Sequence, residues 1–312
     1  MIRIFKTMDG RVQKIPAAEE GSWVALTNPT QDELIEVSEQ FGIDLDDLKG
    51  PLDEEERSRI AVEEKYTLII LDIPTTEERG GKESFYTIPF GIYLTQEHII
   101  TVCLVDTPVL TVFMDGRMRN FRTQKRTRFL YQMLYRNAAM FLQFLRIIDK
   151  KSNEVEKKLH ISQRNQELIE MLELEKGLVY ITTSLRGNEM VLEKLMRNTS
   201  IPRYEDDEEL LEDVIIENKQ AIEMAKIYSD ILSGTMDAFA SVISNNLNIV
   251  MKFLSVITIV LTVPTIVTSA FGMNVGGIPL EHHPWGFWII CAISFLLTLI
   301  AGIIIGKNKN LK

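Results

Sequence analysis

An uncharged run near the C-terminus, residues 253–271, constrains this chain more than any other feature. The run is about as long as a helix that crosses the hydrocarbon core of a bilayer, which needs roughly 20 apolar residues. A second uncharged run, residues 287–305, follows a short loop and begins beside Trp285 and Trp288, residues typical of membrane interfaces. The sequence therefore predicts two membrane-spanning helices in the last part of the chain.

Hydroxyl side chains recur along the first run with a helical period. They are spaced three or four residues apart, so they fall on one face of a helix. The series is Ser255, Thr258, Thr262, Thr265 and Ser269. Several copies of such a helix around an axis would turn these faces inward and line a narrow polar path. Alternatively, the hydroxyls bond back to their own helix or join neighbouring helices, and the spacing alone does not decide between the two interpretations.

The composition argues against several classes of protein. A net charge of -10 argues against a general nucleic-acid binder, because phosphate binding requires a basic face. The two cysteines, Cys103 and Cys291, form neither a disulfide framework nor a CxxC zinc signature. The first residues lack the apolar core of a cleaved signal peptide. No spacing of His, Cys, Ser or acidic residues assembles a catalytic set, so we do not expect an enzyme.

The N-terminal part, residues 1–122, has the pattern of an α/β domain. Thr30 followed by Glu33 predicts the capped start of a helix. A short helix is expected at 44–48, and residues 77–82 are expected to form a hairpin or loop. Short β-branched and aromatic runs bounded by turn residues predict strands at 22–26, 66–73, 85–94 and 98–105.

The central part of the chain has the pattern of long helices. Helices at 126–160 and 163–198 are expected to pair as an antiparallel hairpin, because they are long and their connection is short. Gly187 inside the second helix costs roughly 1 kcal/mol relative to alanine. A third helix begins near Asp207, and no proline interrupts it before Pro264. We expect this helix to continue into the first membrane span as a stalk.

The first membrane span ends in Gly272-Met273-Asn274, and the second span follows closely. This arrangement, behind a large N-terminal part, resembles the CorA family of divalent-cation channels. Phe271 stands where the family usually has tyrosine. The resemblance implies an α+β membrane protein with an N-terminal α/β cytoplasmic domain, a long helical stalk and two C-terminal transmembrane helices. It also implies a funnel-shaped homopentamer.

The resemblance implies a function and a set of pore residues. The expected function is passive, gated transport of hydrated divalent cations, chiefly Mg2+ and also Co2+ and Ni2+. Gly272, Met273 and Asn274 would form the outer selectivity filter, because a ring of neutral amides accepts hydrogen bonds from the water shell of magnesium. The other pore-lining candidates include a polar ring and an apolar gate near the cytoplasmic end. They are Asn248, Met251, Leu254, Ser255, Thr258, Thr262, Thr265 and Ser269.

Acidic residues are the candidates for cation sensing. By the same resemblance, internal magnesium bridges adjacent subunits through carboxylates and holds the pore shut. Asp213 and the adjacent Glu212 are the candidates on the long helix, and Asp72 is the candidate in the α/β domain. In the loop between the spans, Glu281 would form a ring that concentrates cations.

Charges that flank the spans predict the orientation in the membrane. The tail, residues 307–312, is basic, Lys252 precedes the first span, and the loop between the spans has no Lys or Arg. The positive-inside rule then places both termini in the cytoplasm, in a plasma or inner membrane, with the loop outside. The loop holds His282 and His283, for which exposed positions are favoured over zinc binding. The expected partners are lipid, divalent cations and further copies of the chain.

Two alternatives remain open at this point. One is a zinc transporter of a CorA-related branch, which tends to vary the residue at Met273. The other is a membrane-tethered cation sensor without flux. The expected boundaries are 1–122 for the α/β domain, 123–250 for the stalk, 251–274 for the first transmembrane helix, 275–286 for the external loop, 287–306 for the second transmembrane helix and 307–312 for the tail.

Overall fold

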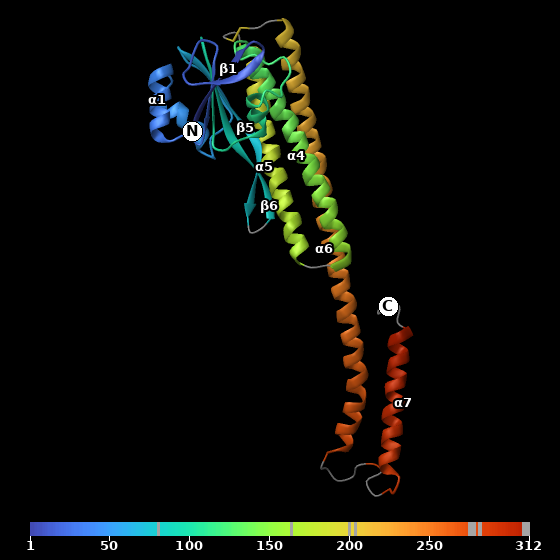
Figure 1. Cartoon of the computed structure of the whole chain (residues 1–312). Helices are drawn as coiled ribbons and strands as arrows, with labels where there is room; N and C mark the ends of the chain where they lie inside the picture. Colours follow the sequence, from blue (N-terminus) through green and yellow to red (C-terminus); the bar gives the residue numbers. More distant parts are fainter. Residues whose placement is uncertain are drawn as a thin grey trace. The chain divides into compact units, whose positions relative to one another are not determined.

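The computed structural model describes residues 1–79, 82–162, 165–198, 201–202, 205–273, 279 and 283–307. The chain divides into two compact units, Met1–Met236 and Asp237–Lys312, and each is described by itself. The first unit contains a mixed sheet with helices on both faces (Figure 1). The second unit contains the C-terminal part of one long helix and a further helix.

Within the described residues, seven strands form a single sheet in the order β2-β1-β3-β7-β6-β5-β4. β3 and β7 pair in parallel, and the other neighbours pair antiparallel. The strands are β1 (Ile2–Met8), β2 (Arg11–Ile15), β3 (Trp23–Thr27), β4 (Arg59–Val62), β5 (Tyr66–Arg79), β6 (Lys82–Thr95) and β7 (Ile99–Cys103). The four predicted strands are confirmed as β3, β5, β6 and β7. Of the two forms expected at 77–82, a hairpin or a loop, the structure has the hairpin: β5 and β6 pair antiparallel, with Arg79 opposite Lys82.

Helices cover both faces of this sheet, because alternate side chains of each strand point to opposite faces and both sets are apolar. Val24 and Leu26 pack with the helices of one layer, α1 and α2, whereas Trp23 and Ala25 pack with α3, α4, α5 and the start of α6. The helical elements of the first unit are α1 (Gln31–Phe41), α2 (Leu45–Lys49), the 3-10 turn η1 (Gly50–Leu52), α3 (Pro108–Met114), α4 (Arg126–Ser162), α5 (Asn165–Arg197) and the first part of α6 (Glu205–Phe271).

The long helices agree with the predicted pattern. α4 and α5 correspond to the expected hairpin pair, and α6 is one helix of 67 residues that includes Pro264. α7 (Gly286–Lys307) corresponds to the second apolar run. The sequence did not predict β1, β2, β4 or α3. The composition of α3 is typical of a strand because it is rich in β-branched residues, yet the Thr107 cap and the burial of Val109 and Phe113 make it helical.

Two glycines allow α5 to approach the sheet closely. A Cβ atom at Gly187 would lie 3.0 Å from the Ser58 hydroxyl, and a Cβ atom at Gly177 would lie 3.0 Å from the Cβ atom of Phe85. The helix-propensity cost that we expected at Gly187 therefore has a packing reason, because a larger residue would push α5 away from Ser58.

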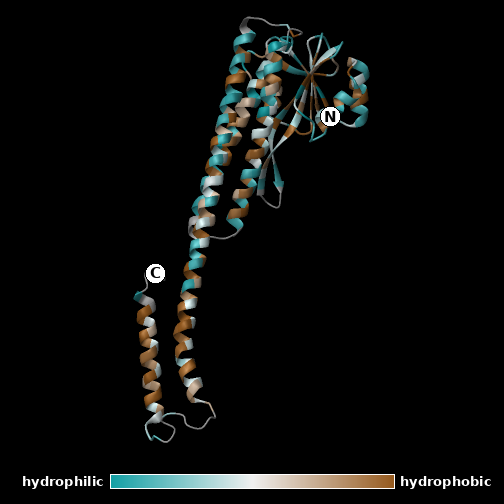
Figure 2. Cartoon of the chain, turned by 180° about the vertical axis from the view of Figure 1, so that it is seen from behind, coloured by the Kyte–Doolittle hydropathy of each residue, from teal (hydrophilic) through white to brown (hydrophobic). Residues whose placement is uncertain are grey.

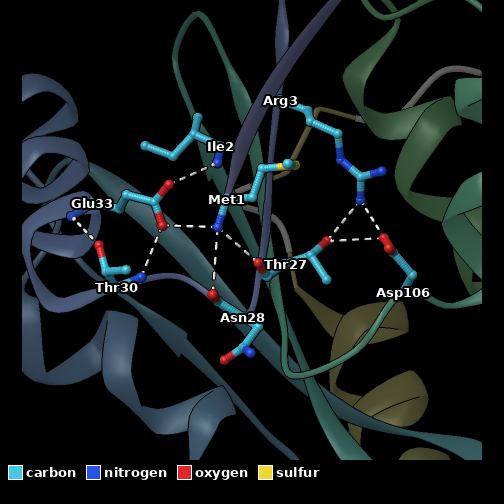
Figure 3. A network of polar contacts seen from close by, with 8 residues as sticks. All are labelled: Met1, Ile2, Arg3, Thr27, Asn28, Thr30, Glu33 and Asp106. Atoms are coloured by element: carbon cyan, nitrogen blue, oxygen red, sulfur yellow. Dashed lines mark hydrogen bonds and ion pairs between the residues drawn. The ribbon is translucent and has the colours of Figure 1, made fainter.

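The predicted cap of α1 is confirmed as part of a wider polar network (Figure 3). The Glu33 backbone N–H donates to the Thr30 hydroxyl at 3.3 Å, and the Glu33 carboxylate accepts from the Thr30 backbone N–H at 2.8 Å. The same carboxylate accepts from the terminal amino group of Met1 at 2.8 Å and from the Ile2 N–H at 3.2 Å. The hydrogen bond from the terminal amino group is the main reason that the pKa of Glu33 is lowered. This network ties β1 to α1.

Replacing the cap is expected to destabilise the first unit. Thr30→Ala removes the hydroxyl acceptor and is predicted to cost about 1 kcal/mol of unfolding free energy, whereas Thr30→Ser keeps the acceptor and is predicted to cost much less. Thermal unfolding of the purified chain, followed by circular dichroism, measures the difference. Equal melting temperatures for the two variants would contradict this role of the hydroxyl.

Candidate functional site

Two described helices are long and apolar enough to cross a membrane. They are α6, over Asp207–Phe271, and α7, over Gly286–Ile304. Figure 2 shows hydrophobic residues along the C-terminal part of α6 and along α7. The hydroxyl series predicted from the sequence lies in this part of α6.

Four of the five hydroxyls of the series donate to backbone carbonyls of their own helix. Thr258 donates to the Leu254 carbonyl at 2.8 Å, Thr262 to the Thr258 carbonyl at 2.7 Å, and Thr265 to the Leu261 carbonyl at 2.8 Å. Ser255 does the same toward the Met251 carbonyl at 2.8 Å. The structure therefore shows the hydrogen bonds back to the same helix that the second interpretation of the spacing expects. A hydroxyl that has donated its proton still presents an oxygen that can accept hydrogen bonds.

The face of α6 that carries these hydroxyls is exposed, and the opposite face carries half-buried residues. At 100° per residue, the exposed hydroxyls and the half-buried residues of the segment are centred roughly 180° apart around the helix. Ser255, Thr258, Thr262, Thr265 and Ser269 are all exposed. The half-buried residues of the same segment are Val256, Val260, Val263, Pro264, Val267 and Phe271. Half-buried residues of α6 thus lie opposite the hydroxyl series, and other apolar residues of the segment, such as Leu261 and Ile266, are exposed as the hydroxyls are.

The other predicted pore residues lie at the two ends of this segment. Asn248, Met251 and Leu254 are exposed on α6, before the hydroxyl series. Gly272 follows the last residue of α6, and its backbone N–H donates to the Thr268 carbonyl at 2.9 Å. Met273 is exposed.

Several predicted positions in the loop between α6 and α7 lie outside the described residues. They are Asn274, Glu281 and His282. His283 is described and is exposed, as the favoured interpretation expects, and its Nδ1 accepts a hydrogen bond from the Trp285 backbone N–H at 3.2 Å.

The predicted sensing residues differ in their surroundings. Glu212 and Asp213 are exposed on α6. Asp72 lies on β5 and is half-buried, and desolvation raises the pKa of its carboxyl, while a hydrogen bond with Ser184 opposes that shift. Among the residues that the structure describes, no three His, Cys, Asp or Glu side chains come together in a group that could hold a metal ion.

Buried amides surround the backbone of Asp72, and the sequence pattern did not single them out. The Asp72 N–H donates to the Asn188 side-chain oxygen at 2.8 Å. The Asp72 carbonyl accepts from the side-chain amides of Asn188 at 2.9 Å and Asn137 at 2.8 Å. Both asparagines are buried, on α5 and α4. The one feature of the sequence that could have indicated this cluster is the presence of asparagines among the apolar residues of the two helices.

A cavity of about 680 Å³ lies between the β4–β5 turn, the start of α4 and the start of α6. The two arginines of its lining already have partners within the chain: Arg126 donates a hydrogen bond to the Thr95 carbonyl, and Arg128 forms an ion pair with Asp207 at 3.3 Å. Four cationic side chains, Lys65, Lys125, Arg126 and Arg128, outnumber the three carboxylates of its lining, Glu63, Glu64 and Asp207. This lining does not suit a divalent cation.

Residues 18–307 match the family described as "CorA-like Mg2+ transporter protein". The chain belongs to this family. A curated relative, the cobalt/magnesium transport protein CorA of Methanocaldococcus jannaschii, is 29% identical over 287 residues, which cover 89% of this chain and 87% of the relative. The protein of the same name from Thermotoga maritima is 22% identical over 317 residues, which cover 98% of this chain and 88% of the relative.

A solved structure extends the likeness to the fold. The complete structure of the CorA magnesium transporter from Methanocaldococcus jannaschii matches with a TM-score of 0.85 and 25% identity. The match covers 99% of this chain and 98% of that chain. The resemblance and the fold class inferred from the sequence are thereby confirmed: an N-terminal α/β part, a long helix and two candidate membrane helices in a CorA-like chain.

Neutralising Asp72 is expected to stabilise the fold when no divalent cation is present. Because its folded pKa lies above the ordinary 3.8, the parent chain gains stability as the pH falls through the folded pKa toward 3.8, and it lacks this gain at pH 7. Asp72→Asn keeps a group that can bond Ser184 and removes the charge. We predict a higher melting temperature than the parent at pH 7 in EDTA, and a smaller difference near pH 4.

Thermal unfolding of the full chain in detergent measures this effect. Asp213→Asn, which neutralises an exposed carboxylate, is the control and is predicted to change the melting temperature little. A lower melting temperature for Asp72→Asn in EDTA at pH 7 would mean that the buried charge stabilises the fold.

Proposed function

We propose that this chain forms a passive, gated channel for hydrated divalent cations, chiefly Mg2+ and also Co2+ and Ni2+. One observation carries the proposal: α6 presents a series of exposed hydroxyl oxygens on one face, opposite a series of half-buried residues. Membership of the CorA-like Mg2+ transporter family and the names of the relatives from Methanocaldococcus jannaschii and Thermotoga maritima support it. The protein is a transporter and not an enzyme.

Five copies of the chain around one axis turn the hydroxyl faces toward a shared path. The oxygens of Thr258, Thr262 and Thr265 have donated their protons to the helix backbone, so they act mainly as acceptors toward the path. Water molecules bound to a cation point their protons outward, and a lining of acceptors therefore suits the hydrated ion. The inside-negative potential drives entry with roughly 2.3 kcal/mol per charge for each 100 mV.

Selection takes place at the outer end of α6. In this proposal, the Asn274 side-chain oxygens form a neutral ring that accepts hydrogen bonds from the water shell of the ion. The Gly272 carbonyl adds acceptors, and Met273 packs the loop against its neighbour. Glu281 forms an external ring that raises the local concentration of cations.

Closure takes place at the cytoplasmic end. Asn248 forms a polar ring there, and Met251 with Leu254 forms the apolar gate, which excludes water when the helices approach one another. Cytoplasmic Mg2+ bridges adjacent subunits through Asp213 and Glu212 on α6 and through Asp72, and thereby holds the pore shut. Loss of cytoplasmic Mg2+ releases the bridge and lets carboxylate repulsion favour the open state.

The domain assignment follows from the same proposal. Residues 1–122 form the cytoplasmic domain, 123–250 the stalk, 251–274 the pore helix and 287–306 the second span. Both termini lie in the cytoplasm of a plasma or inner membrane, because Lys252 and the basic tail flank the spans on that side.

Metal uptake into liposomes that carry the purified protein tests the transport function. Asn274→Ala is predicted to lower Mg2+ uptake at least about tenfold, because a lost hydrogen bond to a charged species is worth about 1.5 kcal/mol. Cobalt hexammine, an inert complex of the size of a hydrated cation, is predicted to block uptake by the parent chain.

Three results would argue against this proposal. Zn2+ uptake without Mg2+ uptake would favour the zinc transporter. Absence of flux for every divalent ion would leave only the membrane cation sensor. Uptake that cobalt hexammine leaves unchanged would exclude selection of the hydrated ion.

The hydroxyl face has its own test in a matched pair of variants. Thr262→Val and Thr268→Val each remove one hydroxyl that bonds back to α6, but Thr268 lies about 90° away from the centre of the series. We predict that Thr262→Val lowers the rate of Mg2+ uptake several-fold and that Thr268→Val leaves it nearly unchanged. Equal effects of the two substitutions would contradict a pore lined by the hydroxyl series.

A further inference from the structure

The outer edge of β5 loses its strand partner just before Asp72. β4 pairs with β5 only from Thr67 to Ile70, where Arg59 lies opposite Ile70. Within the described residues, no strand accompanies that edge from Leu71 onward. A backbone N–H and a carbonyl on a covered strand edge must find other partners, because an unpaired polar group is costly once it is removed from water.

Asn188 takes the place of the missing strand. Its side-chain oxygen accepts from the Asp72 N–H at 2.8 Å, and its side-chain amide donates to the Asp72 carbonyl at 2.9 Å. An asparagine side chain has the same donor and acceptor as a peptide group, so a single residue of α5 reproduces the two bonds that a neighbouring strand makes. Asn137 of α4 adds a second donor to the Asp72 carbonyl, at 2.8 Å.

The surrounding packing is built for these two amides. Asn137 and Asn188 are only 4% and 3% exposed. The Ser58 hydroxyl donates to the Asn188 side-chain oxygen at 3.3 Å, and the absence of a Cβ atom at Gly187 lets α5 come this close to Ser58. The orientation of both amides is set by the Asp72 carbonyl, which accepts hydrogen bonds and therefore requires the nitrogen of each amide on its side.

A small cavity lies beside these amides. Asn137, Asn188 and Asn218 of α6 line it, together with apolar residues, and its volume is about 10 Å³, room for about one water molecule. The Asn137 side-chain oxygen is buried, and within the described chain it has no hydrogen-bond partner. Asn218 donates to the Leu185 carbonyl of α5 at 3.2 Å. The cluster thus connects three helices to one residue of the sheet, and neutral amides in so small a space cannot hold a hydrated cation.

We propose that Asn188, assisted by Asn137, is a positioning residue that fixes the backbone of Asp72 and so aims its carboxylate at the regulatory cation. The inference rests on the proposed function, in which Asp72 takes part in cation sensing. A fixed backbone fixes the direction of the Cα–Cβ bond, and a carboxylate held in place loses less freedom when it binds a cation. An apolar residue at position 188 would leave the Asp72 N–H without a partner, so Asn188 also stabilises the fold, and the test has to separate that stability from cation binding.

The test measures the Mg2+ concentration that gives half of the maximal thermal stabilisation of the full chain in detergent. Asn188→Ala is predicted to raise this concentration roughly fivefold, the factor expected for one net hydrogen bond. In the Asp72→Asn background, Asn188→Ala is predicted to have no further effect on it. Asn137→Ala removes one of the three hydrogen bonds to the Asp72 backbone and is predicted to raise the half-saturating Mg2+ concentration less. This variant replaces Asn188→Ala in the test if Asn188→Ala does not fold. Asn153→Ala, which removes an exposed amide of α4, is the control.

Each other outcome has a distinct meaning. A lower melting temperature in EDTA with an unchanged half-saturating Mg2+ concentration would show a purely structural role for Asn188 and would overturn the inference. The inference is also overturned if Asn188→Ala shifts that concentration equally with and without the Asp72 carboxylate. If Asp72→Asn itself leaves the concentration unchanged, then the sensing role of Asp72 in the proposed function fails, and the positioning role fails with it.

Discussion

A row of hydroxyl oxygens on the otherwise apolar C-terminal segment of α6 is the constraint on which the proposed pore depends. Ser255, Thr258, Thr262 and Thr265 donate their protons to backbone carbonyls of α6, so these four donors are satisfied within the helix. The oxygens remain exposed on the side opposite the half-buried residues. In hydrocarbon these acceptors gain no hydrogen bonds, whereas around a shared axis they meet water. The feature therefore favours an assembly over a single chain in lipid.

One helix serves both units of the chain. In the first unit, Leu211, Val214 and Asn218 of α6 are buried, and Leu211 and Val214 pack against the core beside the sheet. In the second unit, the same helix carries the hydroxyl face. Because Asn218 and Asn188 line one cavity beside Leu71, a change around Asp72 has a physical connection to α6 through packed and hydrogen-bonded groups.

Local patterns predicted the elements that depend on local physics. The Thr30 cap and the hydroxyl period of α6 follow from spacings of three and four residues, and the structure contains both. The hydrogen bond between Asp72 and Asn188 joins residues 116 positions apart, so no local pattern indicated it. The helix α3 was missed for a related reason, since the burial of Phe113 in the core outweighs the β-branched composition. What the sequence could not supply were contacts between distant segments.

The most direct test of the central claim is the structure of the assembly in a lipid nanodisc. We predict that Thr258, Thr262 and Thr265 from every subunit face one central axis and that water or hydrated cations lie between them. A structure in which these three hydroxyls face lipid, or in which the copies of α6 share no axis, would contradict the proposed pore.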